Sequence, residues 1–279
     1  MKLNLKDKIK IPDQIIDERE IFTFFKEVIN NEKFFDLLRK EFSRVENKEI
    51  NPNSMKEPKP YKPQIRDLYR LYSFILLNKR TTVLELGSGW STLFIKIALD
   101  NLKKKYQDEL KELRRADPFK LFTVDNEKKF LAHTKKRMVH FFKDKKLENI
   151  KFCYSDCSVG IYQGKYCIEY SNFPICNPDF IYIDGPDIFN IKGKVNNFSY
   201  GHQDIMPIVA DILRIEYFLI PGTIILIDGR SANAQFLNDF LKRKWIYNFD
   251  ITNDQHIFFL DSPSLGKLND KLIKFYANN

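Results

Sequence analysis

The sequence predicts an α/β protein: a doubly wound, mostly parallel seven-stranded sheet, a C-terminal antiparallel hairpin and an N-terminal helical extension. Short apolar segments alternate with segments of helical period between residues 82 and 241, which is typical of a parallel sheet covered on both faces. Two further strand segments, Trp245–Ile251 and His256–Leu260, are separated only by a turn. This ending predicts an antiparallel pair in place of another parallel one.

The composition fits one large folded domain with an appendage. The chain has 279 residues, 43% of them hydrophobic, which is enough for a sizeable core. We expect residues 1–63 to form a helical extension with a proline-rich linker, and residues 64–279 to form the α/β domain. No apolar run reaches the roughly 18 residues of a membrane span, and the N-terminus lacks a signal core. We therefore expect a cytoplasmic protein without a transmembrane segment.

The net charge of +9 is carried mostly by lysine. It could indicate an anionic partner, such as RNA, a membrane surface or a phosphorylated substrate. Acidic residues interleave nearly every basic cluster, however, which favours a compositional bias spread over solvated faces. The exception is the stretch from Lys135 to Lys146.

Three segments are expected before the first strand. A helix is predicted over Asp17–Arg44, with an apolar face and a weak point at Asn30-Asn31. Four prolines make Asn51–Pro63 a linker or an extended wrap. A second helix, Arg66–Leu77, carries the chain to the first strand.

Strands and helices then alternate. The parallel strands are predicted over Thr82–Leu86, Leu121–Val124, Ile150–Tyr154, Phe180–Ile183 and Thr223–Ile227. The helices are predicted over Ser91–Leu99 (with an apolar stripe continuing to Leu113), Glu127–Lys146, Ile205–Ile215, Ser231–Leu241 and Leu268–Phe275. An inserted hairpin is expected around Gly164-Lys165, and Asp187–Gly201 lacks an apolar period, as lids and binding loops often do.

The turn after the first strand reads Gly87-Ser88-Gly89. Glycines let a ligand approach the backbone, and the following helix start, with Ser91 in its first turn, offers free N–H groups. The third glycine of a dinucleotide-binding turn is missing. Glu85 is the informative residue, because a negative charge suits a ligand with a cationic group better than a phosphate. The alternative is an ordinary turn with a solvated glutamate.

Glu85-Leu86-Gly87-Ser88-Gly89 resembles motif I of the class I S-adenosylmethionine-dependent methyltransferases. The strand–turn–strand ending resembles their sheet, in which an antiparallel strand inserts near the fifth. The resemblance covers about Arg66 to Leu260 and makes residues 64–279 a Rossmann-like methyltransferase domain. It implies S-adenosylmethionine as the cofactor, with this turn, Glu85 and Ser91 among the residues that bind it.

All five parallel strands carry an acid at or beside their carboxyl ends, where ligands of doubly wound sheets bind. These acids are Glu85, Asp125, Asp156, Asp184 and Asp228. The resemblance implies that Asp125 accepts the ribose hydroxyls; the alternative is a helix N-cap. It also implies that Asp156 accepts the adenine amino group; the alternative is a solvated turn residue.

Asp184 and Asp228 are expected to flank the site of methyl transfer. Two carboxylates there could share a divalent cation, as at these strand ends in catechol O-methyltransferase-like enzymes. Gly229 stands where that family uses an amide, so a metal is possible but not favoured. Asp184 is expected to orient the acceptor or act as a general base. The four cysteines form no paired CxxC units, which favours buried thiols over zinc.

Two further residues are catalytic candidates. Arg230 could grip a carboxylate or phosphate, or it could form an ion pair with Asp228 or Asp184 that holds the loop. His202, at the far end of the Asp187–Gly201 loop, could abstract a proton near neutral pH, or it could be a structural hydrogen bonder.

The sequence thus predicts an S-adenosylmethionine-dependent methyltransferase acting at oxygen on a small-molecule or saccharide acceptor. The segments Ile181–Pro186 and Gly222–Arg230 resemble bacterial methyltransferases of surface-polysaccharide biosynthesis. RNA methylation is the alternative that the charge suggests, but Asp184-Gly185-Pro186 replaces the Asn-Pro-Pro-Tyr-like motif of many base-nitrogen methyltransferases. A non-catalytic cofactor-binding module and an NAD-dependent oxidoreductase are further alternatives. The sequence specifies neither the acceptor nor the oligomeric state.

Overall fold

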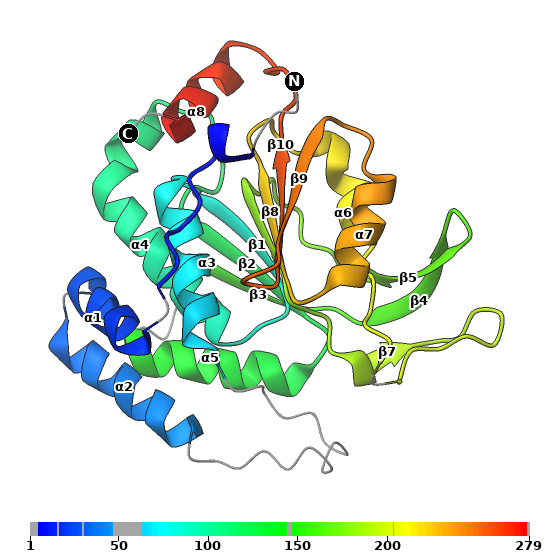
Figure 1. Cartoon of the computed structure of the whole chain (residues 1–279), viewed down its shortest axis with the longest axis horizontal. Coiled ribbons are helices and arrows are strands. Elements are labelled where there is room, and N and C mark those ends of the chain that lie inside the picture. The colour runs from blue at the N-terminus through cyan, green and yellow to red at the C-terminus, as the bar shows by residue number, and fades with distance from the viewer. Residues whose placement is uncertain are drawn as a thin grey trace.

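The structure is a computed structural model that describes residues 5–15, 17–29, 31–46, 63–143, 147–202 and 204–277. The expected linker up to residue 62 and the end of the basic stretch at residues 144–146 lie outside these ranges. One twisted sheet runs through the molecule, with helices packed on both of its faces (Figure 1). Within the described residues, no helix combines the length and the apolar character needed to cross a bilayer.

The main sheet has seven strands in the order β3-β2-β1-β6-β8-β10-β9. All neighbouring pairs from β3 to β8 are parallel, whereas β10 is antiparallel to both β8 and β9. This confirms the predicted parallel sheet with a C-terminal antiparallel hairpin. The strands are β1 (Thr82–Leu86), β2 (Lys120–Asp125), β3 (Ile150–Tyr154), β6 (Phe180–Ile183), β8 (Ile224–Asp228), β9 (Trp245–Asp250) and β10 (Gln255–Leu260).

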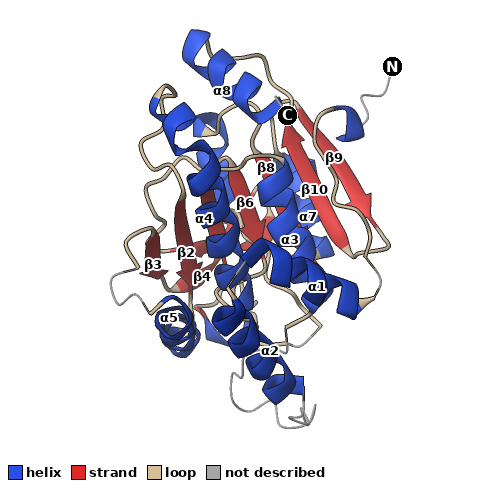
Figure 2. Cartoon of the chain, turned by 90° about the vertical axis from the view of Figure 1, so that its left-hand side faces the viewer, coloured by secondary structure: helices blue, strands red, loops and turns tan. Residues whose placement is uncertain are grey.

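Alternate residues of the central strands face two separate hydrophobic clusters, because successive side chains of a strand point to opposite faces. In β1, Val83 belongs to one cluster and Leu84 to the other, and both are fully buried. The first cluster lies under α1 (Glu18–Ile29), α2 (Glu32–Glu46), α3 (Ile65–Leu77), α4 (Trp90–Lys111), α5 (Lys128–Phe142) and α8 (Lys267–Ala277). The second lies under α6 (Asp211–Ile215) and α7 (Ser231–Phe240), and Figure 2 shows the first group of helices from the side.

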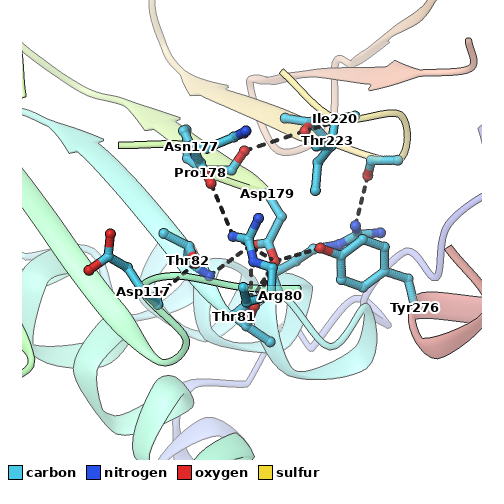
Figure 3. Close-up of polar contacts among 12 residues, drawn as sticks. Arg80, Thr81, Thr82, Asp117, Asn177, Pro178, Asp179, Ile220, Thr223 and Tyr276 are labelled. Carbon is cyan, nitrogen blue, oxygen red and sulfur yellow. Dashed lines mark hydrogen bonds and ion pairs between the residues drawn. The ribbon is translucent and has the colours of Figure 1, made fainter. Parts of the chain in front are cut away.

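A buried polar network fixes the amino ends of the central strands (Figure 3). Asp179, just before β6, accepts hydrogen bonds from the backbone N and hydroxyl of Thr81 and from the hydroxyl of Tyr276 (2.7 Å). Arg80 stacks on the Tyr276 ring at 4.1 Å and donates to the carbonyl of Gly222 at 2.7 Å. The network therefore joins β1, β6 and α8 at the edge of the sheet opposite the carboxyl ends.

The long segment after β6 is tied to the end of β2. It contains a 3-10 turn, η2 (Ile188–Asn190), and a short strand, β7 (Ile191–Lys192). The side chain of Asn126 accepts from the backbone N of Asp187 (2.9 Å) and donates to the carbonyls of Asp187 (3.1 Å) and Asn190 (3.2 Å). The inserted hairpin is confirmed as β4 (Cys157–Tyr162) and β5 (Lys165–Tyr170), and β7 pairs with β4.

Three predicted helices have different bounds in the structure. The helix expected over Ile205–Ile215 is wrong in its first half, because α6 begins only at Asp211. The residues before it are irregular: Val209 bridges to Ile168, Asn233 bonds to the Val209 backbone, and Ala210 is the N-cap of α6. The N-terminal helix is divided into α1 and α2 at the predicted weak point, and α4 is one continuous helix of 22 residues.

Candidate functional site

The turn after β1 brings two backbones into contact. Gly87 has a φ of +97°, and a Cβ there would lie 2.7 Å from the backbone N of Gly185, after β6. Only glycine suits such a position, because an added side chain would meet backbone atoms that cannot move aside. Gly87, Ser88 and Gly89 remain half-exposed. The turn is thus pressed against the end of β6 while its own backbone stays partly open to solvent.

Glu85 lies beneath this turn and is fully buried. Its two carboxylate oxygens accept hydrogen bonds from Ser91 (2.6 Å) and Thr92 (2.7 Å) in the first turn of α4. Burial raises the pKa of Glu85 to about 7, and the hydroxyl donors oppose that rise. The residue is therefore not a solvated turn glutamate, and it fastens the start of α4 to β1. Because Glu85 has no exposed surface, its charge would act on a bound cation electrostatically, over a distance, and not by direct contact.

Asp125, at the end of β2, is bound to the glycine turn. Its Oδ2 atom accepts from the backbone N (2.8 Å) and the hydroxyl (2.6 Å) of Ser88, and Oδ1 accepts from the backbone N of Glu127 (2.8 Å). The N-cap of α5 is Glu127, which accepts from Lys129, so Asp125 is not the helix cap. Burial raises the pKa of Asp125, while the hydrogen bonds from Ser88 and Glu127 lower it. One carboxylate thus joins the ends of two neighbouring strands.

A cavity of about 350 Å³ lies beside the ends of β2 and β3, at the lower end of the range for small-ligand sites. Asp156 lines it and accepts from the Tyr154 hydroxyl (2.5 Å) and from Lys192 (2.7 Å). The Lys192 and Tyr154 contacts lower the pKa of Asp156, so this carboxylate is charged. Together with Tyr154, the half-buried Ile191 and the exposed Phe189 supply apolar surface to the same cavity.

Asp184 and Asp228 follow the neighbouring strands β6 and β8, as predicted. The Asp184 side chain is 53% exposed, yet surrounding protein limits its hydration and raises its pKa to about 7. Asp228 is half-buried and accepts from the hydroxyl of Tyr182 (3.1 Å) and the amide of Gln255 (3.3 Å). Burial raises the pKa of Asp228. Asp184 is consequently the carboxylate of this pair that a ligand can reach and that can exchange a proton near neutral pH.

Sequence reasoning missed Asp67, in the first turn of α3. It is half-buried, and burial followed by repulsion from Asp228 and Asp184 raises its pKa to about 7. Arg70, one turn later, is buried and binds Gln255 (2.8 Å) and Asp250 (2.6 Å) on the hairpin. The available signal was an acid, Asp67, one turn before a second charged residue, Arg70, at the start of a mostly apolar helix. The helix before β1 therefore supplies part of the acidic cluster.

Arg230 holds the segment that follows β6. Its Nη2 atom donates to the carbonyls of Asp184 (2.7 Å) and Pro186 (3.2 Å), and Nε lies 3.9 Å from Asp184 Oδ1. These contacts correspond to the loop-holding alternative. Nη1 is buried and has no hydrogen-bond partner among the described residues. The guanidinium also favours the charged form of Asp184 and lowers its pKa.

The two histidines near this region differ in their surroundings. His202 is 66% exposed, and its contacts are to Asp204, whose backbone N donates to Nδ1 at 3.2 Å. Its predicted role as a base remains untested. His256, on β10, is buried between the Ser231 hydroxyl (3.0 Å from Nε2) and the Tyr247 hydroxyl (2.9 Å from Nδ1). Its burial lowers its pKa, so it is neutral near pH 7.

The described residues contain no group of three or more histidine, cysteine or acidic side chains placed to hold a metal ion. What the site offers is a row of acids along one sheet edge. Asp125 touches the glycine turn, Asp156 lines a cavity, and Asp184 is exposed beside Arg230. Such an arrangement can attract a cationic ligand, accept hydrogen bonds from hydroxyl groups and take up a proton.

No protein-family model matches the chain, and no curated protein matches it either. Several solved structures are similar in fold. The O-methyltransferase TomG from Streptomyces achromogenes is 12% identical with a TM-score of 0.41, over 89% of this chain and 100% of that one. Rv0187 from MTB is 9% identical with a TM-score of 0.44, over 90% and 100%. The O-methyltransferase from Bacillus cereus is 12% identical with a TM-score of 0.38, over 87% and 97%. At such identities and TM-scores, no function transfers from these proteins to this chain.

Proposed function

We propose that the protein is an S-adenosylmethionine-dependent methyltransferase that acts at oxygen on a small-molecule or saccharide acceptor. One observation carries the proposal: Asp125 joins the end of β2 to the glycine turn after β1, beside a third strand end that presents the exposed Asp184. The insertion of antiparallel β10 next to β8 supports the same assignment. A saccharide acceptor and a place in surface-polysaccharide biosynthesis rest on the sequence resemblance alone.

The residues at this edge fit the proposed cofactor. The half-exposed backbone of Gly87–Gly89 offers a close approach for the amino-acid part. Asp125 is buried under Ser88, so it can accept from ribose hydroxyls where they displace the Ser88 hydroxyl from its Oδ2 atom. The cavity next to Asp156 has the apolar walls and the charged acceptor that an adenine ring with its amino group requires. The acids also complement a positive charge. When bound, the cofactor supplies a methyl group that is already activated for transfer.

The chain's own residues then have two tasks. They must hold the acceptor in line with the methyl group, and they must remove the hydroxyl proton of the acceptor. Asp184 suits the second task, because its carboxylate is exposed and its pKa of about 7 matches neutral conditions. Arg230 positions the Asp184 backbone, and Asp67 faces the same region from α3. The N-terminal helices and the Asp187–Gly201 loop are proposed to form the acceptor side.

Isothermal titration calorimetry tests the cofactor. Wild-type protein should bind S-adenosylmethionine and its demethylated product but not NAD. Asp125→Ala should weaken that binding about 10-fold or more, because one good hydrogen bond to a charged group contributes about 1.5–3 kcal/mol. Lys274→Ala, exposed on α8, is the matched control and should bind as wild type does. Tight binding of NAD without any response to the sulfonium compounds would overturn the proposal.

The acceptor is tested separately, by the release of demethylated cofactor during turnover. A panel of saccharides and small hydroxyl compounds should include a substrate, whereas RNA oligonucleotides should give no release above background. Turnover with RNA alone would favour RNA methylation. If the protein bound the cofactor but turned over no acceptor, and if Asp184→Asn bound the cofactor equally well, a non-catalytic binding module would be favoured.

A further inference from the structure

The outward face of α5 is uniformly basic. Residues 128–143 contain five lysines and one arginine but no acidic residue, within a chain whose net charge is +9. All five lysines are exposed, as are both histidines of the helix, while Leu131, Thr134, Met138 and Phe141 are buried against the sheet. The lysines are Lys128, Lys129, Lys135, Lys136 and Lys143. The part of the basic stretch up to Phe142 therefore belongs to one amphipathic helix, with its lysines on the solvent face and Lys143 directly after its end.

This basic face is extended and lies at the edge of the molecule. The 15 residues of α5 span about 22 Å at 1.5 Å per residue. Figure 2 shows the helix nearly end-on, at the periphery of the fold. Lys128, near its start, borders the cavity beside Asp156, and Phe142, at its end, borders a second hollow. The face thus runs from the candidate site to a separate surface depression.

The charges on this face are not neutralised internally. Lys129, Lys135, Lys136 and Lys143 form no ion pair within the part of the chain that the structure describes. On α4, by contrast, Lys96 pairs with Asp100 and Lys111 with Asp108. Unpaired lysines that share one surface repel one another, and an anionic partner relieves that repulsion.

The hollow at the end of α5 is lined by apolar side chains, by polar residues that include Asp100, and by two lysines. Its volume is about 520 Å³, and Ile29, Phe34, Ile97 and Phe142 contribute apolar side chains. Lys103 and Lys104 of α4 are exposed at its rim. Apolar surface next to lysines suits a molecule that joins an anionic group to hydrocarbon.

We propose that this face of α5 docks the protein on an anionic lipid bilayer. The exposed lysines lie along one side of a straight helix, so they can approach a flat charged surface together. The helix exposes no phenylalanine, tyrosine or tryptophan on which nucleic-acid bases could stack. The apolar hollow beside the lysines also favours lipid over nucleic acid. This inference does not depend on the proposed methyl transfer, because the lysines that test it, Lys129, Lys135 and Lys136, do not line the cavity beside Asp156.

Vesicle co-sedimentation without cofactor or acceptor tests the proposal. Wild-type protein should bind vesicles of phosphatidylcholine with phosphatidylglycerol but not vesicles of phosphatidylcholine alone, and added salt should weaken the binding. The variant Lys129→Glu/Lys135→Glu/Lys136→Glu should bind at least about 100-fold more weakly. This follows because each lysine near an anionic surface contributes about 1 kcal/mol, a factor of about five.

The control variant carries the same charge change elsewhere. Lys267, Lys271 and Lys274 are exposed lysines of α8. Their replacement by glutamate changes the net charge equally but leaves the basic face of α5 intact, so vesicle binding should stay within a few-fold of the wild-type level. Equal loss in both variants, or binding to neutral vesicles, would overturn the proposal. So would tighter binding of duplex RNA through the same α5 lysines at the same salt. If the glutamate variant does not fold, the glutamine variant at the same three positions repeats the comparison.

Discussion

Asp184 is the side chain whose ionisation would set the pH dependence of the proposed reaction. A general base acts only when deprotonated, so kcat/KM should rise with pH through about 7, the pKa of Asp184. Arg230, whose Nε lies 3.9 Å from this carboxylate, favours the charged form. Arg230→Gln should therefore raise the pKa of Asp184 and move the rising limb to higher pH. Arg230→Lys keeps the charge and should leave the limb close to its wild-type position.

Two observations control this experiment at the residue scale. Asp184→Asn should abolish the rising limb while the calorimetric binding of demethylated cofactor persists. Because Arg230 also holds the backbone of Asp184 and Pro186, thermal unfolding of each variant shows whether the loop is still in place. An unchanged limb in Asp184→Asn would exclude this carboxylate as the base and would favour Asp67, whose pKa is also about 7.

Among the elements, α8 is attached by apolar packing of Leu272, Phe275 and Tyr276 and by one buried hydrogen bond, from the Tyr276 hydroxyl to Asp179. Tyr276→Phe removes the donor to the buried Asp179 and keeps the ring beneath Arg80. The free energy of unfolding should fall by about 1.5–3 kcal/mol, as for other hydrogen bonds to charged groups. Tyr217→Phe is the control, because Tyr217 is 71% exposed, and should change it by less than about 0.5 kcal/mol. Urea unfolding measures both, and equal effects would mean that the network of Figure 3 does not hold α8.

The elements also show what a sequence can specify. The strands β3 and β6 have the predicted bounds, because a short apolar run between turn residues is a local signal. The start of α6 has no such signal: Ile168 and Asn233, distant in sequence, bond to Val209 and keep it out of the helix. The acids at strand ends were likewise predictable, whereas Asp67 joins them only through the packing of α3. Contacts between distant segments are what local patterns leave undetermined.

At the scale of the molecule, the N-terminal helices and the α/β domain share one hydrophobic core. Phe25 of α1 is fully buried and packs on Tyr72 of α3 (5.6 Å between centroids) and Phe94 of α4 (4.6 Å). Phe25→Ala should lower the free energy of unfolding by about 3–5 kcal/mol. Calorimetric melting of the wild type should show a single transition. Two separate transitions, with only the first shifted in the variant, would show instead that residues 1–63 fold as an independent unit.

The three hydrogen bonds that join Asn126 to the segment of residues 187–190 have a kinetic consequence. Phe189 and Asn190 of this segment line the cavity beside Asp156, so we expect the segment to open before a ligand that spans the glycine turn and this cavity can leave. The ligand would then dissociate only after these three hydrogen bonds break. Its residence time would depend on the opening of residues 187–190 as well as on its affinity. In that case the exchange of demethylated cofactor for S-adenosylmethionine, and not the chemical step, would limit the rate of the catalytic cycle.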